Sequence, residues 1–178
     1  MNVPVTLWLD RFTDARGAIQ RVYLDSLYSA ARIKALPNSQ DWPLAHEWRQ
    51  DNAVITAQGV LRGIHGNLGD NNWTLFTLLY GRIYLVVVNC MPQGFGRWHN
   101  LRLSSWVDNR SVAEQLLIPP GWGRAYYVES EVAVVHYKWT TPYEEQKQFT
   151  YRYDDSRFGI IWPFKGIPVL SARDSEPL

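Results

Sequence analysis

Short apolar segments separated by turn residues recur along this chain, and their spacing constrains the fold more than any other feature of the sequence. Strand-like runs are expected at residues 74–80, 82–89, 98–104, 113–118, 125–129 and 132–140. They follow one another at roughly ten-residue intervals, and glycine, proline and asparagine stand between them. This pattern is typical of a sandwich or barrel. We therefore expect an all-β fold in which Gly81 is the turn of a hairpin between the first two runs.

The N-terminal part of the chain carries weaker signals. Residues 3–9 and 18–23 are expected to be two short strands joined by the polar turn 12–17. Residues 25–36 form the best helix candidate, with a proline just beyond the end. At 178 residues the chain has the length of one domain, spanning 1–178, that can bury a substantial core.

Composition and charge exclude several classes of protein. Eighteen Lys and Arg against 17 Asp and Glu leave a net charge of +1, too balanced for nucleic-acid or membrane binding. The longest apolar run, residues 83–88, is too short to span a bilayer, and the N-terminus lacks a signal-peptide pattern. With one cysteine no intrachain disulfide can form, so a cytoplasmic location is expected. Nine Trp, ten Tyr and six Phe supply flat faces for a ring-shaped ligand.

Residues 59–67 are the best candidate for a functional segment, because Arg62 and His65 stand between glycines at the end of an apolar run. An arginine beside an imidazole suggests anion binding next to acid–base catalysis. On a regular strand these two side chains would point to opposite faces, unless the strand bulges at Gly63. The same rule puts Tyr137 and His136 on opposite faces of their strand, so only one of them can face the interior.

Other kinds of site lack their residues. A three-histidine metal site in a barrel needs a second histidine two positions after His65, where Asn67 stands, so we expect no metal and no cofactor. No nucleophile elbow or phosphate-binding glycine loop is present, and Cys90 follows a core strand, where a buried thiol is inert. Proton transfer by His, Tyr, Asp and Glu in an aromatic, arginine-bearing pocket is the chemistry that remains.

Several segments together resemble the dTDP-4-dehydrorhamnose 3,5-epimerase family of metal-free, cupin-type enzymes. The resemblance covers nearly the whole chain, and the order and spacing of the segments carry it. These segments are residues 12–17, 50–52, 59–65, 81–89, 95–98, 118–122, 137–143, 162–163 and 170–174. The resemblance implies a cupin-type jelly-roll barrel with short peripheral helices.

The resemblance also implies a reaction. A 4-keto group acidifies the protons on C3 and C5 of a nucleotide-linked sugar, a base removes one of them, and an acid returns a proton to the opposite face of the enolate. His65 would be the base, Asp174 would orient its imidazole, and Tyr137 would be the acid. A structural interpretation stands beside each role: His65 as a hydrogen-bonded core histidine, Tyr137 as a packed strand residue, and Asp174 as part of a solvated C-terminal tail.

Substrate contacts are implied on several segments. Arg62 would lie against the diphosphate or the enolate oxygen, Gln50 and Asn52 would bind the sugar, and Tyr143 would help to hold the nucleotide. Arg16 would reach a ligand across the interface of a homodimer. The implied partner is a nucleoside-diphosphate 4-keto sugar.

The chain departs from the family pattern at several positions. Thr74 stands where the family usually has a lysine that polarises the enolate, Arg124 replaces a usual histidine, and Gly66 and Asn67 replace a tyrosine and a glutamine. Arg124 and Asn67 are therefore expected to contact the substrate in place of the residues that are usual in the family. The sequences at residues 65–67 and 120–128 look closer to those of the branch that acts on GDP-linked 4-keto-heptoses.

Three functions follow from this sequence. The first is an epimerase that inverts C3, C5 or both in a nucleotide-linked 4-keto-6-deoxyhexose or 4-keto-heptose. The second is a catalytically silent cupin that binds a sugar nucleotide, which the missing lysine would suggest. The third is a ketoisomerase that uses the same enolate chemistry and is distinguished by its product.

Overall fold

The computed structural model describes residues 3–23, 48–67, 72–106, 112–144 and 147–176. The described elements are β1 (Val5–Asp14), β2 (Gly17–Gln20), β3 (Gln50–Ala57), β4 (Leu61–Asn67), β5 (Thr74–Asn89), β6 (Trp98–Ser105), β7 (Val112–Ile118), β8 (Trp122–Val128), β9 (Val132–Trp139), β10 (Gln148–Thr150) and α2 (Ala172–Ser175). The all-β, cupin-type fold is thus confirmed. The helix expected at 25–36 lies outside the described residues.

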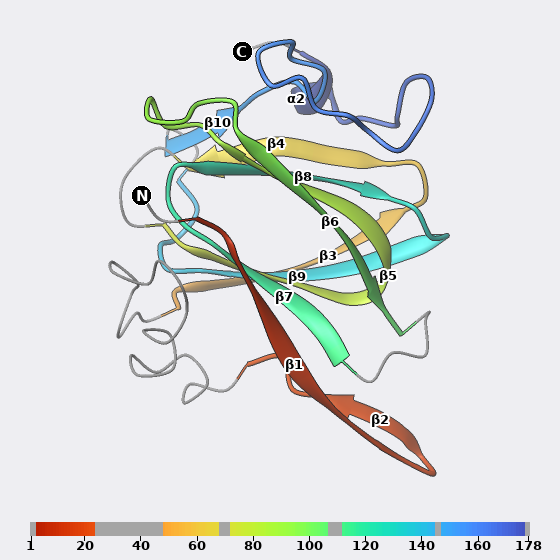
Figure 1. Ribbon diagram of the computed structural model, residues 1–178. Coiled ribbons are helices and arrows are strands. Elements are labelled where there is room, and N and C mark those ends of the chain that lie inside the picture. The colour runs from red at the N-terminus through yellow and green to blue at the C-terminus, as the bar shows by residue number, and fades with distance from the viewer. Residues whose placement is uncertain (1–2, 24–47, 68–71, 107–111, 145–146, 177–178) are drawn as a thin grey trace.

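The strands form two layers that face each other across the core (Figure 1). In one layer β3 pairs with β9, β9 with the first half of β5, and β5 with β7, which pairs in turn with β1. In the other layer β6 pairs with the second half of β5, β5 with β8, β8 with β4, and β4 with β10. All of these pairs are antiparallel, as in a jelly roll.

The hairpin expected at Gly81 is wrong, because β5 runs through this residue as one strand of 16 residues. Gly81 has a φ of +97°, and an added Cβ would lie 2.4 Å from the carbonyl oxygen of Val132. Before Gly81 the strand pairs with β7 and β9, and from Gly81 onward it pairs with β6 and β8. The glycine therefore bends the strand from one layer into the other instead of reversing it.

The interior holds a large group of buried apolar side chains, which we call the apolar core. Most of it comes from β5, β6 and β7, and β8 and β9 complete it. Its members are Phe76, Leu78, Ile83, Leu85, Val87, Leu103, Leu116, Ile118, Trp122, Tyr126, Val128, Ala133 and Val135. Alternation along each strand turns these residues inward, so the inner face of every strand can be read from its register with this core.

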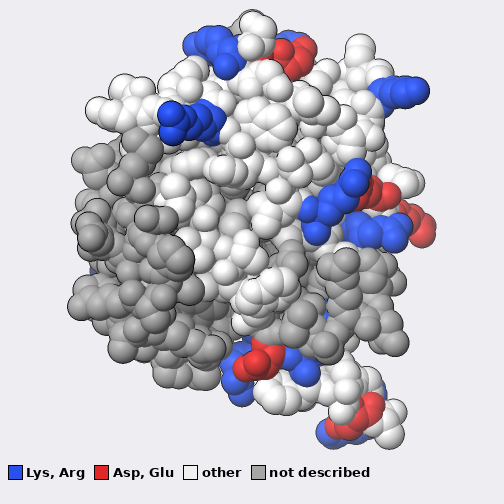
Figure 2. Space-filling model, in the orientation of Figure 1, with Lys and Arg blue, Asp and Glu red and all other residues white. Residues whose placement is uncertain are grey.

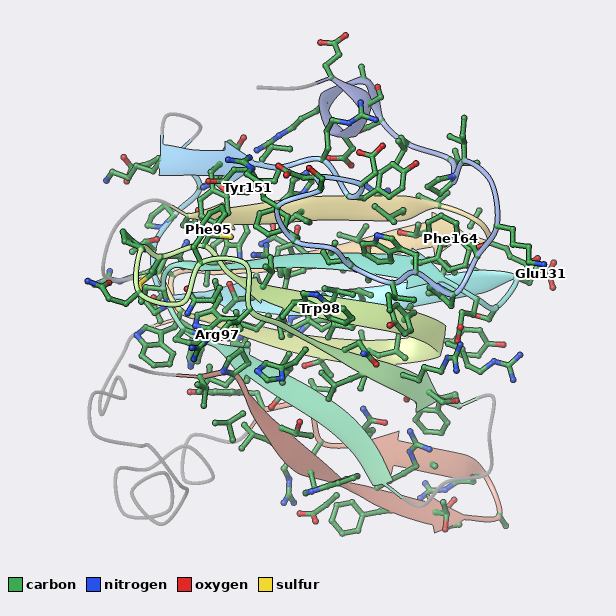
Figure 3. All side chains as sticks on the ribbon, turned by 45° about the horizontal axis from the view of Figure 1, so that its top comes forward. Phe95, Arg97, Trp98, Glu131, Tyr151 and Phe164 are labelled. Atoms are coloured by element: carbon green, nitrogen blue, oxygen red, sulfur yellow. The ribbon has the colours of Figure 1, made fainter. Side chains whose placement is uncertain are left out.

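The C-terminal segment runs over the outer face of the layer that contains β4 and β8. Tyr151 of this segment lies towards one end of the layer, beside Phe95 from the loop between β5 and β6, and Phe164 lies towards the other end (Figure 3). The ring centroids of Phe95 and Tyr151 are 6.1 Å apart, and Phe164 packs against Tyr127 of β8 at 4.6 Å. The segment then ends in the short helix α2, beside β4.

The N-terminal strands form a hairpin that projects from the body (Figure 1). The turn expected at 12–17 is shorter than predicted, because Phe12 pairs with Ile19 and Asp14 with Gly17 inside the ladder. Phe12 is 53% exposed and Ile19 is 69% exposed. The hairpin thus presents apolar side chains that the described part of the chain does not cover.

Charged side chains are dispersed over the face shown in Figure 2, in small groups separated by uncharged surface. Half of the described ion pairs join residues two or three positions apart, such as Arg16 with Asp14 and Arg157 with Asp155. In the described ranges, no helix combines the length and the apolar character needed to cross a membrane.

Candidate active site

Polar side chains line the interior next to the apolar core, on β3 and β4 and on part of β8 and β9. In the register of β3 with β9, Gln50 lies opposite Trp139 and Asn52 opposite Tyr137. In the register of β4 with β8, Arg62 lies opposite Tyr126 and His65 opposite Arg124. Directly opposed residues in a ladder share a face, so these side chains converge on the interior. We call the following residues the polar cluster: Gln50, Asn52, Thr56, Arg62, His65, Arg124, Tyr137 and Trp139.

A bulge in β4 brings Arg62 and His65 to the same face. The register with β8 shifts between these two residues, so that Gly63 and Ile64 together oppose the single residue Ala125. Gly63 has a φ of +112°, and a Cβ there would lie 2.4 Å from the Arg124 carbonyl oxygen. Only glycine fits this position, and the extra residue restores the inward direction of Arg62. The alternative of a bulge at Gly63 is therefore the correct one.

His65 is paired with Asp174, which lies 109 residues away in sequence. The His65 Nε2 atom is 2.5 Å from Asp174 Oδ1, and the carboxylate is 3% exposed. Ser171 caps helix α2, and its side-chain oxygen accepts a hydrogen bond from the Asp174 amide at 3.2 Å. If Nε2 donates to the carboxylate, Nδ1 of the neutral imidazole is an acceptor for a proton.

The environment of Asp174 favours its ionised form. Burial alone would raise the pKa of this carboxyl group, but hydrogen bonding and charge attraction from His65, together with bonds from Ser171 and the Gly63 amide, hold the pKa below its usual value. An ionised carboxylate in this place stabilises the positive charge that the imidazole acquires when it takes a proton.

Arg124 is the ladder partner of His65, and its guanidinium lies over two aromatic rings of the polar cluster. Its guanidinium carbon is 5.2 Å from the ring centroid of Tyr137 and 5.5 Å from that of Trp139. The two rings are themselves 5.3 Å apart. Burial lowers the pKa of Arg124, and the nearby Tyr137 and Tyr126 hydroxyls act in the opposite direction. An arginine nonetheless stays protonated at neutral pH.

Gln50, Asn52 and Tyr143 are joined by hydrogen bonds. Gln50 Nε2 donates to Asn52 Oδ1 at 3.0 Å, and the Tyr143 amide donates to Gln50 Oε1 at 2.6 Å. The Tyr143 ring stacks on Trp139 with centroids 6.1 Å apart and planes 18° apart. This network leaves two buried donors, Asn52 Nδ2 and Trp139 Nε1, with no partner in the described part of the chain.

Arg62 lies at the border of the polar cluster and is exposed. Its Nε donates to Thr56 Oγ1 at 3.1 Å, and that hydroxyl is 3.3 Å from the Tyr126 hydroxyl. Burial raises the pKa of Tyr126, while Thr56, Arg62 and Arg124 each lower it in part. Both arginines therefore act on the same region of the interior.

Asn67 and Gly66 play different parts. Asn67 is 7% exposed and its side-chain oxygen accepts from Gln148 Nε2, so the amide is held beside the polar cluster. At Gly66 an added Cβ would lie 2.1 Å from the Phe149 ring. Packing on the outer face explains this glycine, so Gly66 gives no reason to infer a different substrate.

Arg16 is the one expected site residue that the chain does not bring to the others. It lies in the turn between β1 and β2, at the end of the projecting hairpin (Figure 1), and pairs with Asp14 at 2.6 Å. Its expected role requires a second copy of the chain.

Sequence reasoning missed Trp139, Thr56 and Tyr126 as neighbours of the site. Strand parity already put Trp139 on the face of Tyr137, and Tyr126 on the face of Arg124. The contact between Thr56 and Arg62 depends on the bulge and on the opposition of two layers, which no local pattern reports.

The arrangement suits proton transfer. The described residues contain no three His, Cys, Asp or Glu side chains grouped as metal ligands would be. Burial raises the pKa of the Cys90 thiol to about 12, which removes it as a nucleophile at neutral pH. The groups that can act are an imidazole–carboxylate pair, a phenol and two arginines.

The sequence was compared with known families and relatives. It matches the dTDP-4-dehydrorhamnose 3,5-epimerase family over residues 4–177. It is 33% identical over 129 residues to the dTDP-4-dehydrorhamnose 3,5-epimerase of Salmonella typhimurium, covering 71% of this chain and 68% of that protein. It is 30% identical over 166 residues to the enzyme of that name from Neisseria gonorrhoeae, covering 92% of this chain and 45% of that protein.

The fold was compared with solved structures. One similar structure is the dTDP-6-deoxy-D-glucose-3,5-epimerase of Legionella pneumophila, in complex with dTDP-4-keto-L-rhamnose. It aligns with a TM-score of 0.79 and 26% identity, covering 96% of this chain and 84% of that one.

Proposed function

Because the chain belongs to the dTDP-4-dehydrorhamnose 3,5-epimerase family, we propose that it inverts C3, C5 or both in a nucleotide-linked 4-keto sugar. The substrate would be a 4-keto-6-deoxyhexose or a 4-keto-heptose, and no metal takes part. The observation that carries the proposal is the pairing of His65 with a buried carboxylate, on the inner face that also holds Arg124 and Tyr137.

In this mechanism His65 takes a proton from the carbon beside the ketone. Asp174 holds the imidazole and stabilises its charged form, and Tyr137 returns a proton to the other face of the enolate. The position of Arg124 against both His65 and the Tyr137 ring supports the idea that the two groups flank one substrate. The base and acid would then act from opposite faces of the sugar, as inversion requires.

Substrate contacts are proposed for the other polar residues. Asn52 and Gln50 would bind the sugar, and the Asn52 amide has a buried donor available for this. Tyr143, 46% exposed and stacked on Trp139, would help to hold the nucleotide. Arg62 would contact the diphosphate. The names of the relatives favour dTDP as the nucleotide, and a GDP-linked heptose remains the second candidate because of the departures at residues 67 and 124.

A homodimer is part of this proposal. The projecting hairpin carries the exposed Phe12 and Ile19, and Arg16 is at its end. Docking of this hairpin on a second copy would cover the apolar side chains and bring Arg16 to the partner's ligand. Phe12→Glu should lower the mass measured by light scattering from that of a dimer to that of a monomer, and an unchanged mass would contradict this.

The direct test is hydrogen exchange in deuterated water. The protein is incubated with dTDP-4-keto-6-deoxyglucose or with a GDP-4-keto-heptose, and the sugar is followed by NMR. Deuterium at C3 or C5 supports the proposal, and His65→Ala should abolish it. Thermal stabilisation by these sugars without exchange would instead indicate a binding protein, and a ketone that moves to another carbon would indicate a ketoisomerase. Full exchange by His65→Ala would remove His65 as the base.

A further inference from the structure

Arg124 is one of the two arginines of the polar cluster. Arg124 extends from the inner face of β8, directly opposite His65, and its guanidinium lies over the rings of Tyr137 and Trp139. Within the described residues, no carboxylate forms an ion pair with it. The carboxylate of Asp174 is paired with His65 instead.

Such an arrangement is costly unless something uses the charge. Arg124 is half-buried, and taking a guanidinium partly out of water without a counter-ion carries a desolvation penalty, which contact with aromatic faces offsets only in part. A second donor beside it, Trp139 Nε1, is buried and has no partner among the described residues, in a side chain that is 5% exposed. The two groups together suit an oxygen atom that carries negative charge.

The proposed reaction produces such an oxygen, and the inference rests on that reaction. When the C–H bond beside the ketone breaks, its proton goes to His65 and its electron pair forms a C=C bond, so the carbonyl oxygen becomes an enolate O⁻. When Tyr137 gives its proton to the carbon, the electrons return and the C=O bond is restored. No oxidant or reductant is needed. The transient charge calls for a fixed positive group between the base and the acid.

We infer that Arg124 is the catalytic residue that binds the 4-keto oxygen and stabilises the enolate, and that the rings of Tyr137 and Trp139 hold its guanidinium in place. The other groups at this position do not compete for the role. Thr74, opposite Trp139 on β5, is buried and uncharged. Arg62 is exposed and donates to Thr56.

The test compares Arg124→Met with Arg102→Met. Arg102 is a matched control because its guanidinium also lies over a tyrosine ring, that of Tyr84 at 5.6 Å, but it is exposed and paired with Glu129. Two quantities are measured: the exchange rate at saturating dTDP-4-keto-6-deoxyglucose or GDP-4-keto-heptose, and the Kd of the corresponding free nucleotide, dTDP or GDP. The free nucleotide has a diphosphate but no ketone, so it separates the two anionic groups of the substrate.

Arg124→Met should lower the exchange rate by about 10²- to 10³-fold, as the loss of one oxyanion donor does, and leave the Kd of the nucleotide within about twofold. Arg124→Lys should recover part of the rate because it keeps a charge, and Arg102→Met should leave both values unchanged. Arg124→Gln repeats the test if the methionine variant does not fold.

Three results would overturn the inference. Exchange by Arg124→Met at the wild-type rate would show that the charge is not used. A loss of nucleotide affinity as large as the loss of rate would assign Arg124 to the diphosphate. Absence of exchange by the wild type with both sugars would remove the enolate itself, and would refute the proposed function together with this inference.

Discussion

The apolar core and the polar cluster differ in whether their buried groups need partners. The apolar core, to which β5, β6, β7, β8 and β9 all contribute, consists of side chains such as Leu85 and Leu103, which are almost wholly buried and need no hydrogen-bond partners. The polar cluster of β3, β4, β8 and β9 holds a half-buried cation and two buried donors, for which the described residues supply no partner. The apolar core stabilises the fold, whereas the polar cluster lowers its stability by holding polar groups ready for a ligand.

The largest effect is expected where the polar cluster acts chemically. His65→Gln should lower the exchange rate by about 10³- to 10⁴-fold, because the imidazole that accepts the proton is lost. The free energy of unfolding should change little by comparison. His136→Gln, on the outer face of β9, is the control and should exchange as the wild type does. An equal loss of exchange rate in both variants would contradict the assignment of catalysis to the inner face of the barrel.

The apolar core should show the reverse behaviour. Leu85→Ala removes a fully buried side chain and should lower the free energy of unfolding by about 2–5 kcal/mol, measured by urea denaturation. Below the melting temperature its exchange rate should equal that of the wild type. A large loss of exchange rate in a folded Leu85→Ala protein would show that the apolar core affects catalysis as well as stability.

Arg124 should be a residue that lowers stability. Arg124 is half-buried and has no ion-pair partner among the described residues, so replacing it with an apolar side chain of similar length is expected to raise the free energy of unfolding by about 1 kcal/mol. The gain should be seen in the same denaturation experiment, in the absence of ligand. A clear loss of stability in Arg124→Met would mean that the guanidinium is a structural group.

The smallest effect is a pH dependence that comes from Asp174. Its pKa is below the ordinary value in the folded protein, so the group adds stability above the pKa of the unfolded chain and loses that contribution as pH falls through the folded pKa. Asp174→Asn should therefore be less stable than the wild type at pH 7, by about 1 kcal/mol. The difference should shrink below about pH 4, where the unfolded carboxyl group takes up a proton. A difference that stays constant with pH would contradict this assignment.

The sequence predicted the strands better than it predicted how they are connected. The apolar runs on either side of Gly81 were predicted, but a strand that bends into a second layer has the same local pattern as a hairpin. Only the partners of each half distinguish the two, and these are distant in sequence. The turn of the first hairpin was also misplaced. Phe12 stands between two polar residues, which is typical of a turn, yet it pairs with Ile19 inside the ladder.

For the candidate site, the resemblance to a family supplied what local patterns could not. No spacing rule links His65 to Asp174, and the structure brings them to hydrogen-bond distance. Parity put Tyr137 and His136 on opposite faces without telling which one is the inner face, and the bulge at Gly63 was left open because its register depends on β8. Trp139 was overlooked although it shares that inner face, because an unpartnered indole N–H becomes apparent only when the surrounding atoms are placed.

The most direct test of the account is the product formed by Tyr137→Phe in deuterated water. If His65 acts on one face of the sugar and Tyr137 on the other, this variant should still remove a proton and return deuterium to the same face. The account predicts labelled sugar of retained configuration from Tyr137→Phe, and neither label nor inversion from His65→Gln. Inverted sugar formed by Tyr137→Phe at the wild-type rate would contradict the claim that these two residues flank one substrate.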